Sequence, residues 1–146
     1  MQINHLIRVS GFSNSGKTTT ITWCFHKFLE NTFLCGFQAL ENGDFVAVVA
    51  HKKNKIAFIS GGDNKKQVKA NYNALESLGI KDIAVCVFAT RTKGGSVQFW
   101  REIAKENKTK IKLLSRKRAK SKSAKEINAC NQRNSDALFK KIKAYL

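Results

Sequence analysis

The sequence predicts an α/β protein with a mainly parallel sheet of about five strands and a β-hairpin at its edge. Three observations lead to this prediction. Strand-like apolar runs alternate with segments of helical periodicity, a glycine-rich loop joins the first strand to the first helix, and residues 82–89 form a near-continuous apolar run. Such a run is typical of a strand buried on both faces of a parallel sheet, and the alternation is typical of helices packed on both sides. The 146 residues suit one domain, placed here over residues 1–146.

The first half of the chain predicts a strand, a helix and a hairpin. The first strand is expected at residues 3–9. Helical periodicity follows the glycine-rich loop, with apolar residues at Ile21, Cys24, Phe25, Phe28 and Leu29. Two β-rich runs, residues 45–50 and 55–60, face each other across a short polar turn and predict the hairpin. We interpret Gly36 and Gly43 as marks of an irregular connection before it.

The second half predicts two helices around the buried strand, then a short strand and a long helix. Asn64 is a candidate cap for the first of these helices, with Gln67 three residues on to complete a capping box, and Gly79 ends it. A weak fifth strand is expected at residues 110–114, and the last helix at about residues 124–145.

Topology rules then predict where ligands bind. We expect the first strand to be central, with the strands at residues 55–60 and 82–89 on either side of it. In such sheets, ligands bind outside the carboxyl ends of the strands. The loops at residues 11–18, 60–64 and 90–96 should therefore meet at the site.

The glycine-rich loop carries the strongest functional motif. Gly11, Gly16, Lys17 and Thr18 fit the pattern G-x-x-x-x-G-K-[ST]. Its glycines let backbone N–H groups turn toward a polyphosphate, and the start of the following helix favours negative charge. The lysine reaches the β- and γ-phosphates, and the threonine hydroxyl is placed for Mg²⁺. The predicted nucleotide-binding residues are Gly11, Phe12, Ser13, Asn14, Ser15, Gly16, Lys17, Thr18 and Thr19.

Through this motif, and through the order of elements over about residues 1–115, the chain resembles the P-loop NTPase superfamily. The order after the loop also resembles small GTPases. More loosely, the chain looks like small P-loop proteins of bacteria and their mobile elements. The resemblance implies a three-layer P-loop fold and Mg²⁺-dependent nucleotide binding. It favours ATP over GTP, because the chain has no Asn-Lys-x-Asp motif for guanine.

P-loop enzymes also need an acid at the end of a neighbouring strand to support the magnesium. Asp63 is our candidate, although Ser60, Gly61 and Gly62 intervene where such enzymes usually have the acid directly at the strand end. The competing interpretation is that Asp63 or Asn64 only caps the next helix. Asp44 and Glu41, before the hairpin, are the alternative acids, and in a kinase they are possible contacts for the acceptor.

A loop after the buried strand supplies candidate catalytic cations. Arg91 or Lys93 would stabilise charge on a transferred phosphoryl group, as an arginine supplied in cis does. The alternative is a solvated turn in which Ser96 caps the following helix. The predicted catalytic set is thus Lys17, Asp63 and Arg91, and the predicted metal ligands are Thr18 and Asp63.

Charge points to a possible second partner. The net charge is +17, and residues 105–125, which begin at Lys105 and end at Lys125, hold ten basic residues and one acid. This segment contains no aromatic residue, so it would hold phosphates rather than stack on bases. It can be a lid over substrate phosphates, a nonspecific nucleic-acid or other polyanion site, or a solvated loop with compositional bias, since 21 Lys stand against 6 Arg.

The sequence therefore predicts a Mg²⁺-dependent, ATP-binding protein, an NTPase or a small phosphotransferase such as a nucleotide or nucleoside kinase. The rival interpretation is a nucleic-acid-binding module for which nucleotide is a structural or switching ligand. Apolar runs are too short to cross a bilayer, and the four cysteines lack metal-site spacing, so we expect a soluble, cytoplasmic protein with no membrane partner and largely buried thiols. Hydrolase or kinase, the acceptor and the oligomeric state stay open.

Overall fold

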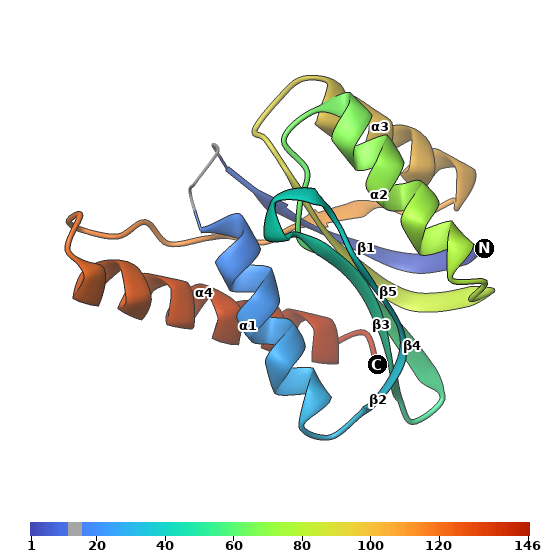
Figure 1. Ribbon diagram of the computed structural model, residues 1–146, viewed down its shortest axis with the longest axis horizontal. Helices are drawn as coiled ribbons and strands as arrows, with labels where there is room; N and C mark the ends of the chain where they lie inside the picture. The colour runs from blue at the N-terminus through green and yellow to red at the C-terminus, as the bar shows by residue number, and fades with distance from the viewer. Residues whose placement is uncertain (12–15) are drawn as a thin grey trace.

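Six strands form one mixed, mostly parallel sheet in the order β2-β3-β4-β5-β1-β6 in the computed structural model, which describes residues 1–11 and 16–146 (Figure 1). The strands are β1 (Gln2–Ser10), β2 (Phe33–Ala39), β3 (Phe45–His51), β4 (Asn54–Ile59), β5 (Asp82–Thr90) and β6 (Ile111–Leu113). Strands β4, β5, β1 and β6 pair in parallel, whereas β2, β3 and β4 pair antiparallel. The carboxyl ends of the four parallel strands therefore lie at one edge of the sheet.

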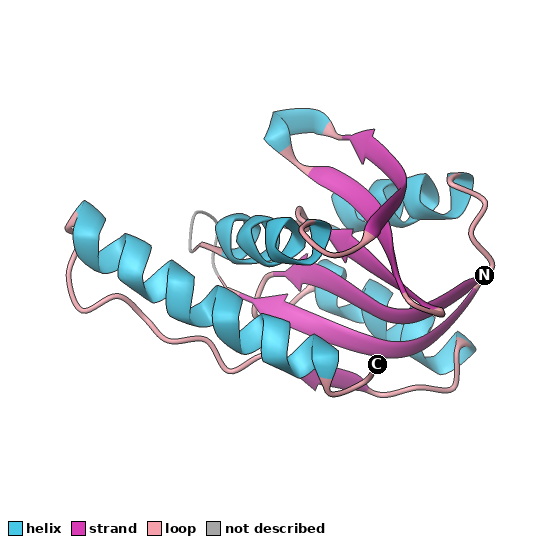
Figure 2. Ribbon diagram, turned by 90° about the horizontal axis from the view of Figure 1, so that it is seen from below, coloured by secondary structure: helices cyan, strands magenta, loops and turns pink. Residues whose placement is uncertain are grey.

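Helices cover both faces of this sheet. They are α1 (Lys17–Leu29), α2 (Lys65–Ser77), α3 (Gly95–Glu106) and α4 (Ala124–Lys143), and a short 3-10 turn, Glu41–Gly43, joins β2 to β3. Helices α1 and α4 pack together on one face, and α2 and α3 cover the other (Figures 1 and 2). Within the part of the chain that is described, no helix is both long enough and apolar enough to span a bilayer.

Two apolar cores result, one on each face. Leu138 and Ile142 of α4 join Ile21 and Phe25 of α1 on one side, and Trp100 of α3 is fully buried on the other. The α/β class, the hairpin, the buried strand, the short β6 and the final helix are thus confirmed.

The predicted strand order is wrong in one respect. Strand β1 is flanked by β5 and β6, and β4 pairs with β5 instead of β1. The reason is burial. Residues 83–89 of β5 carry no charged side chain, so this strand takes the place between β4 and β1, whereas β1 contains His5 and Arg8.

The sheet also has an edge that the sequence did not predict. The edge strand is β2, so the sheet has six strands and the hairpin is not its edge. Gly36, interpreted as part of an irregular connection, lies inside β2, where a register shift falls between Leu34 and Gly36. Cys35 is exposed there, which corrects the expectation of buried thiols for this one cysteine, and Phe33 is 82% exposed.

Candidate functional site

The described ends of the glycine-rich loop lie at the carboxyl end of β1 and at the start of α1 (Figure 1). Gly11, Gly16, Lys17, Thr18 and Thr19 are described, whereas the predicted ligands Phe12, Ser13, Asn14 and Ser15 lie outside the described residues. Gly16 has a φ of 89°, and a Cβ atom there would lie 2.5 Å from Asn131 Oδ1 of α4. Both the left-handed backbone and this close approach favour glycine at the start of α1.

The Lys17 side chain is buried, with 6% exposure, and its ammonium group donates to three oxygen atoms. It donates to the carbonyl oxygens of Gly11 at 3.0 Å and Thr90 at 3.2 Å, and to Asp63 Oδ1 at 2.7 Å. An uncompensated buried ammonium would cost several kcal/mol. The ends of β1 and β5 together with Asp63 therefore hold this cation at the mouth of the loop.

The topology explains why Asp63 does not follow β4 directly. Strand β5 separates β4 from β1, so the two outer strands are about 9–10 Å apart. After β4, the chain crosses the end of β5 through Ser60, Gly61 and Gly62, and this brings the Asp63 carboxylate to Lys17. A Cβ atom on Gly62 would clash with the carbonyl oxygen of Ala89 in β5. The intervening residues are thus the bridge that carries the carboxylate across the buried strand.

Asn64, and not Asp63, caps α2. The Asn64 side chain accepts a hydrogen bond from the Gln67 backbone N–H at 2.8 Å. The Gln67 side chain accepts from the Asp63 backbone N–H at 2.6 Å, which is one residue earlier than in a standard capping box. Capping is therefore supplied by the neighbour, and the Asp63 carboxylate faces Lys17.

A second carboxylate, Asp44, lies beside Thr18. The Thr18 hydroxyl is 3.3 Å from Asp44 Oδ1 and 3.1 Å from the Ser60 carbonyl oxygen. The Ser60 hydroxyl accepts from the Phe45 N–H at 2.8 Å and lies 3.2 Å from Asp44 Oδ1. Burial raises the pKa of Asp44 above its ordinary value, and the negative charge of Asp63 adds to the rise, although bonds from Ser60 and Thr18 oppose it. Of the two predicted alternatives to Asp63, this is the one at the site, whereas Glu41 is exposed in the preceding turn.

Arg91 approaches the same carboxylate. Its Nε lies 3.9 Å from Asp63 Oδ1, and the side chain is about half exposed, at 49%. Its backbone N–H donates to Ser96 Oγ at 3.3 Å. Ser96 is buried inside α3 and does not cap it, since Gly94 is the residue before the helix, so that part of the solvated-turn interpretation is wrong. Lys93 is exposed.

Arg8, on β1, ties this loop to the sheet. Its Nη2 donates to Ser10 Oγ and to the Thr92 carbonyl oxygen, each at 3.2 Å. Burial lowers the pKa of Arg8, and the nearby positive charge of Arg101 lowers it further. The charge on this strand is therefore bound to the loop that carries Arg91.

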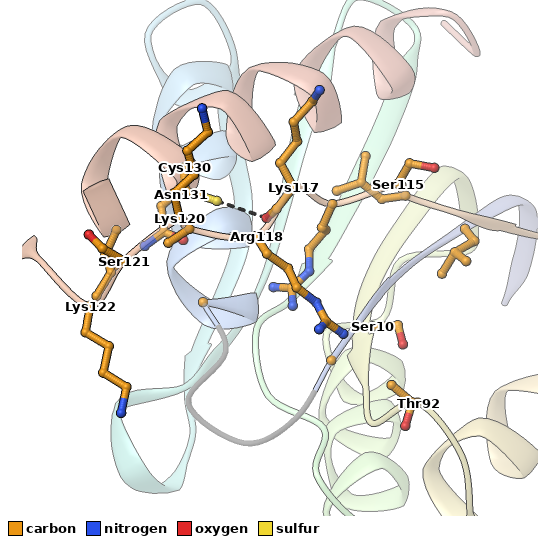
Figure 3. Close-up of a pocket in the computed structure, with 17 residues that line it drawn as sticks. Ser10, Thr92, Ser115, Lys117, Arg118, Lys120, Ser121, Lys122, Cys130 and Asn131 are labelled. Atoms are coloured by element: carbon orange, nitrogen blue, oxygen red, sulfur yellow. Dashed lines mark hydrogen bonds between the residues drawn. The ribbon is translucent and has the colours of Figure 1, made fainter. Parts of the chain in front are cut away.

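Two cavities adjoin Gly16. One, of about 690 Å³, is lined by Lys17, Thr18, Asp44 and Asp63 among others. The other, of about 710 Å³, runs from Ser10 and Gly11 along the basic segment to α4 (Figure 3). Gly16, Ile127 and Asn131 line both.

Sequence reasoning did not identify the contribution of α4 to this site. Ile127 and Cys130 were part of a periodic apolar stripe, which indicated only a core helix, and Asn131 lies next to that stripe. Nothing in the local pattern around residue 131 points to a loop more than 110 residues earlier in the chain, so the contact with Gly16 could be found only in the fold.

The donor set of the first cavity suits a hard cation. Among the described residues, no group of three or more His, Cys, Asp or Glu side chains is placed to hold a metal. Mg²⁺ does not need one, because it binds one or two carboxylates and takes its other ligands from water and phosphates. The Thr18 hydroxyl beside the Asp44 carboxylate, with Asp63 in the same cavity, fits that requirement.

Comparison with known proteins adds no further assignment. No family model, no curated protein and no solved structure matched the chain. Membership of the P-loop superfamily therefore stays a prediction, which depends on the motif and on the arrangement of the residues described above.

Proposed function

We propose that this protein binds ATP with Mg²⁺ at the carboxyl edge of the sheet and transfers or hydrolyses the γ-phosphate. One observation carries the proposal. The motif lysine, Lys17, is buried at the start of α1, and its ammonium group is held between the ends of two parallel strands and Asp63. A phosphate chain at this helix start would receive backbone N–H groups, the helix dipole and the ammonium together.

The triphosphate would lie in the first cavity. Gly16, Lys17, Thr18 and Thr19 line it, and the predicted contacts of Gly11 and of residues 12–15 would complete the loop. Mg²⁺ would be held by Thr18, Asp44 and Asp63, and when bound it neutralises charge on the phosphates. A cavity of about 690 Å³ is within the usual size range of ligand sites.

The reaction needs little more than placement and charge. An oxygen of water or of an acceptor bonds to the γ-phosphorus while the bond from phosphorus to the β–γ bridging oxygen breaks, and ADP leaves with the electron pair. Lys17 and Arg91 would stabilise the spreading negative charge, since Arg91 Nε lies 3.9 Å from Oδ1 of Asp63, which lines the cavity. The acceptor's proton is released to solvent or to a carboxylate of the site.

Calorimetric titration with ATP and Mg²⁺ tests the proposal. Lys17→Ala should weaken binding at least about tenfold, because a charge-assisted contact to phosphate is worth about 1.5–3 kcal/mol. Lys69→Ala removes the same charge from the exposed face of α2 and should bind like the parent. Equal affinity of the Lys17 variant and the parent would contradict the assignment of this loop as the nucleotide site.

A further inference from the structure

The second cavity has an unusual lining. It lies between the end of β1, the segment after β6 and the first turns of α4 (Figure 3). Among the described residues that line it, every charged side chain is basic: Arg116, Lys117, Arg118, Lys120 and Lys122. A cavity with this lining attracts an anion and repels a cation.

The segment that carries these cations is fixed to α4. The Lys117 backbone N–H donates to Asn134 Oδ1 at 2.7 Å, and its carbonyl oxygen accepts from Asn134 Nδ2 at 3.0 Å. The Cys130 thiol also donates to that carbonyl, and Leu114 is buried, with its N–H bonded to the Arg8 carbonyl oxygen. The basic residues are thus presented by an anchored backbone, which favours a built binding site over a solvated loop.

Arg116 and Arg118 are the two arginines of this lining. Figure 3 shows the Arg118 guanidinium directed across the cavity toward Ser10. Burial lowers the pKa of Arg116, and the positive charge of Arg118 lowers it as well, whereas Cys130 opposes the change. An anion between the two guanidinium groups would relieve their repulsion, and a phosphate suits their planar donors.

We propose that this cavity binds the phosphate backbone of a single-stranded nucleic acid and brings it beside the phosphate loop, as the second ligand of the site. The role of the strand as a second ligand beside ATP rests on the proposed function. The binding of the strand by this cavity does not. The ligand is a polynucleotide because the cations continue along the chain beyond the lining residues, with Lys110 and Lys112 before them and Lys125 after them. A small phosphate ester would use only the two arginines.

The shape and chemistry of the cavity specify the form of the nucleic acid. Its volume of about 710 Å³ is that of a small-ligand site, so unpaired nucleotides can enter whereas a duplex would reach only the rim. Among the described residues that line it there is no aromatic side chain, so these residues do not stack on bases or read them. Binding should therefore be independent of sequence and strongly dependent on salt.

Fluorescence anisotropy with a labelled single-stranded oligonucleotide of about ten nucleotides, in the absence of ATP, tests the inference. The double variant Arg116→Gln/Arg118→Gln should bind at least about tenfold more weakly than the parent at moderate salt. The plot of log affinity against log salt should flatten by about 1.4, which is two phosphate contacts at about 0.7 each. Lys52→Gln/Lys53→Gln makes the same charge change in the exposed β3–β4 turn and should retain the parent's affinity and slope.

Several outcomes would overturn it. If the arginine variant binds the oligonucleotide like the parent, the cavity does not hold the strand, and a concurrent loss of ATP affinity would assign it to the nucleotide instead. An equal loss in the Lys52/Lys53 variant would reduce the effect to net charge. Duplex binding as tight as single-strand binding, or equal competition by inorganic phosphate, would exclude an unpaired strand as the ligand.

Two controls keep the experiment decisive. Arg118→Gln alone changes an exposed side chain and tests the site if the double variant does not fold, as monitored by circular dichroism. Lys17→Ala separates this inference from the proposed function, because it should weaken ATP binding at least about tenfold and leave oligonucleotide affinity unchanged. If both variants bind ATP like the parent and the arginine variant no longer binds the oligonucleotide, the ATP site is disproved and the strand site is supported.

Discussion

The Lys17 ammonium donates to Asp63 Oδ1 at 2.7 Å, although β5 separates the strands that precede these two residues. The lysine is buried and the carboxylate is about 40% exposed, so the pair lies at the boundary between the core and the first cavity. In this arrangement the Asp63 carboxylate forms an ion pair with the ammonium group that the proposed function assigns to phosphate. Nucleotide binding would then exchange one anion for another on Lys17.

This exchange predicts an unusual gain of affinity. Asp63→Asn should tighten ATP binding in the absence of Mg²⁺ by about tenfold, because ATP no longer has to replace a charge-assisted bond to the lysine. Calorimetric titration with excess EDTA measures this. Asp82→Asn, which removes an exposed acid at the opposite end of β5, is the matched control and should have no effect. Weaker metal-free binding of the Asp63 variant would show that the pair organises the site and does not compete with phosphate.

The contacts of Thr18 predict which acid supports the metal. Asp44, and not Asp63, is the carboxylate within hydrogen-bonding distance of the Thr18 hydroxyl. Asp44→Asn should therefore reduce the Mg²⁺-dependent part of ATP affinity or turnover more than Asp63→Asn does. Titration at increasing Mg²⁺ compares the two variants directly. The opposite ranking would favour Asp63, as the sequence alone predicted.

The raised pKa of Asp44 predicts a stability difference that depends on pH. A carboxyl group whose pKa is higher in the folded protein than in the unfolded chain disfavours folding once it is ionised. Asp44→Asn removes that charge and keeps an oxygen to accept from Ser60. The metal-free variant should therefore melt at a higher temperature than the parent at neutral pH. The difference should vanish below about pH 4, where the aspartate is protonated in both states.

Thermal unfolding followed by circular dichroism from about pH 3 to pH 8 measures this difference. Saturating Mg²⁺ and ATP should reverse its sign, because bound ligand stabilises the parent in proportion to its affinity. A variant that is less stable than the parent at neutral pH without metal would mean that the bonds from Ser60 and Thr18 outweigh the burial of the charge.

The bridge across β5 predicts a strong effect of a single methyl group. A Cβ atom on Gly62 would clash with the Ala89 carbonyl oxygen, which cannot move without disturbing β5. Gly62→Ala should lower the free energy of unfolding by about 1–3 kcal/mol, the usual cost of overpacking, and should weaken ATP and Mg²⁺ binding because Asp63 is displaced. Denaturant unfolding and calorimetry measure the two effects.

Gly36→Ala is the control for this variant. A Cβ atom there meets the flexible end of Leu78 at 3.1 Å, and Gly36 lies on the edge strand far from the loop. This substitution should change stability little and ligand affinity not at all. If Gly62→Ala also leaves both quantities unchanged, the crossing at the end of β5 is not the constraint described here.

Local signals predicted much of this fold, and long-range pairing limited the rest. Asn64 with Gln67, the hairpin turn and the apolar run of β5 are features that a few neighbouring residues specify, and all three are present. The position of β5 between β4 and β1 depends on which strand tolerates burial on both faces, which is a comparison among distant segments. The three residues that separate Asp63 from the end of β4, which depart from the usual pattern, follow from that position. Asn131 meets Gly16 only because α4 folds back across α1.

Arg8 predicts a separation of binding from turnover. Its Nη2 donates to the Thr92 carbonyl oxygen and so positions the loop that carries Arg91. Arg8 itself is not among the residues that line the Lys17 cavity. Arg8→Leu fills the same strand position without the charge, and removal of a partly buried cation of lowered pKa should leave the fold intact. ATP affinity should stay within about twofold of the parent, whereas kcat should fall about tenfold or more, because a misplaced cation no longer stabilises charge on the transferred phosphoryl group.

Arg101→Leu, which removes the neighbouring exposed charge from α3, is the control and should leave kcat unchanged. Steady-state turnover of ATP, with KM and kcat resolved, tests this role. An equal rise in KM for both variants, with kcat unchanged, would show that Arg8 acts only through general electrostatic attraction of the nucleotide.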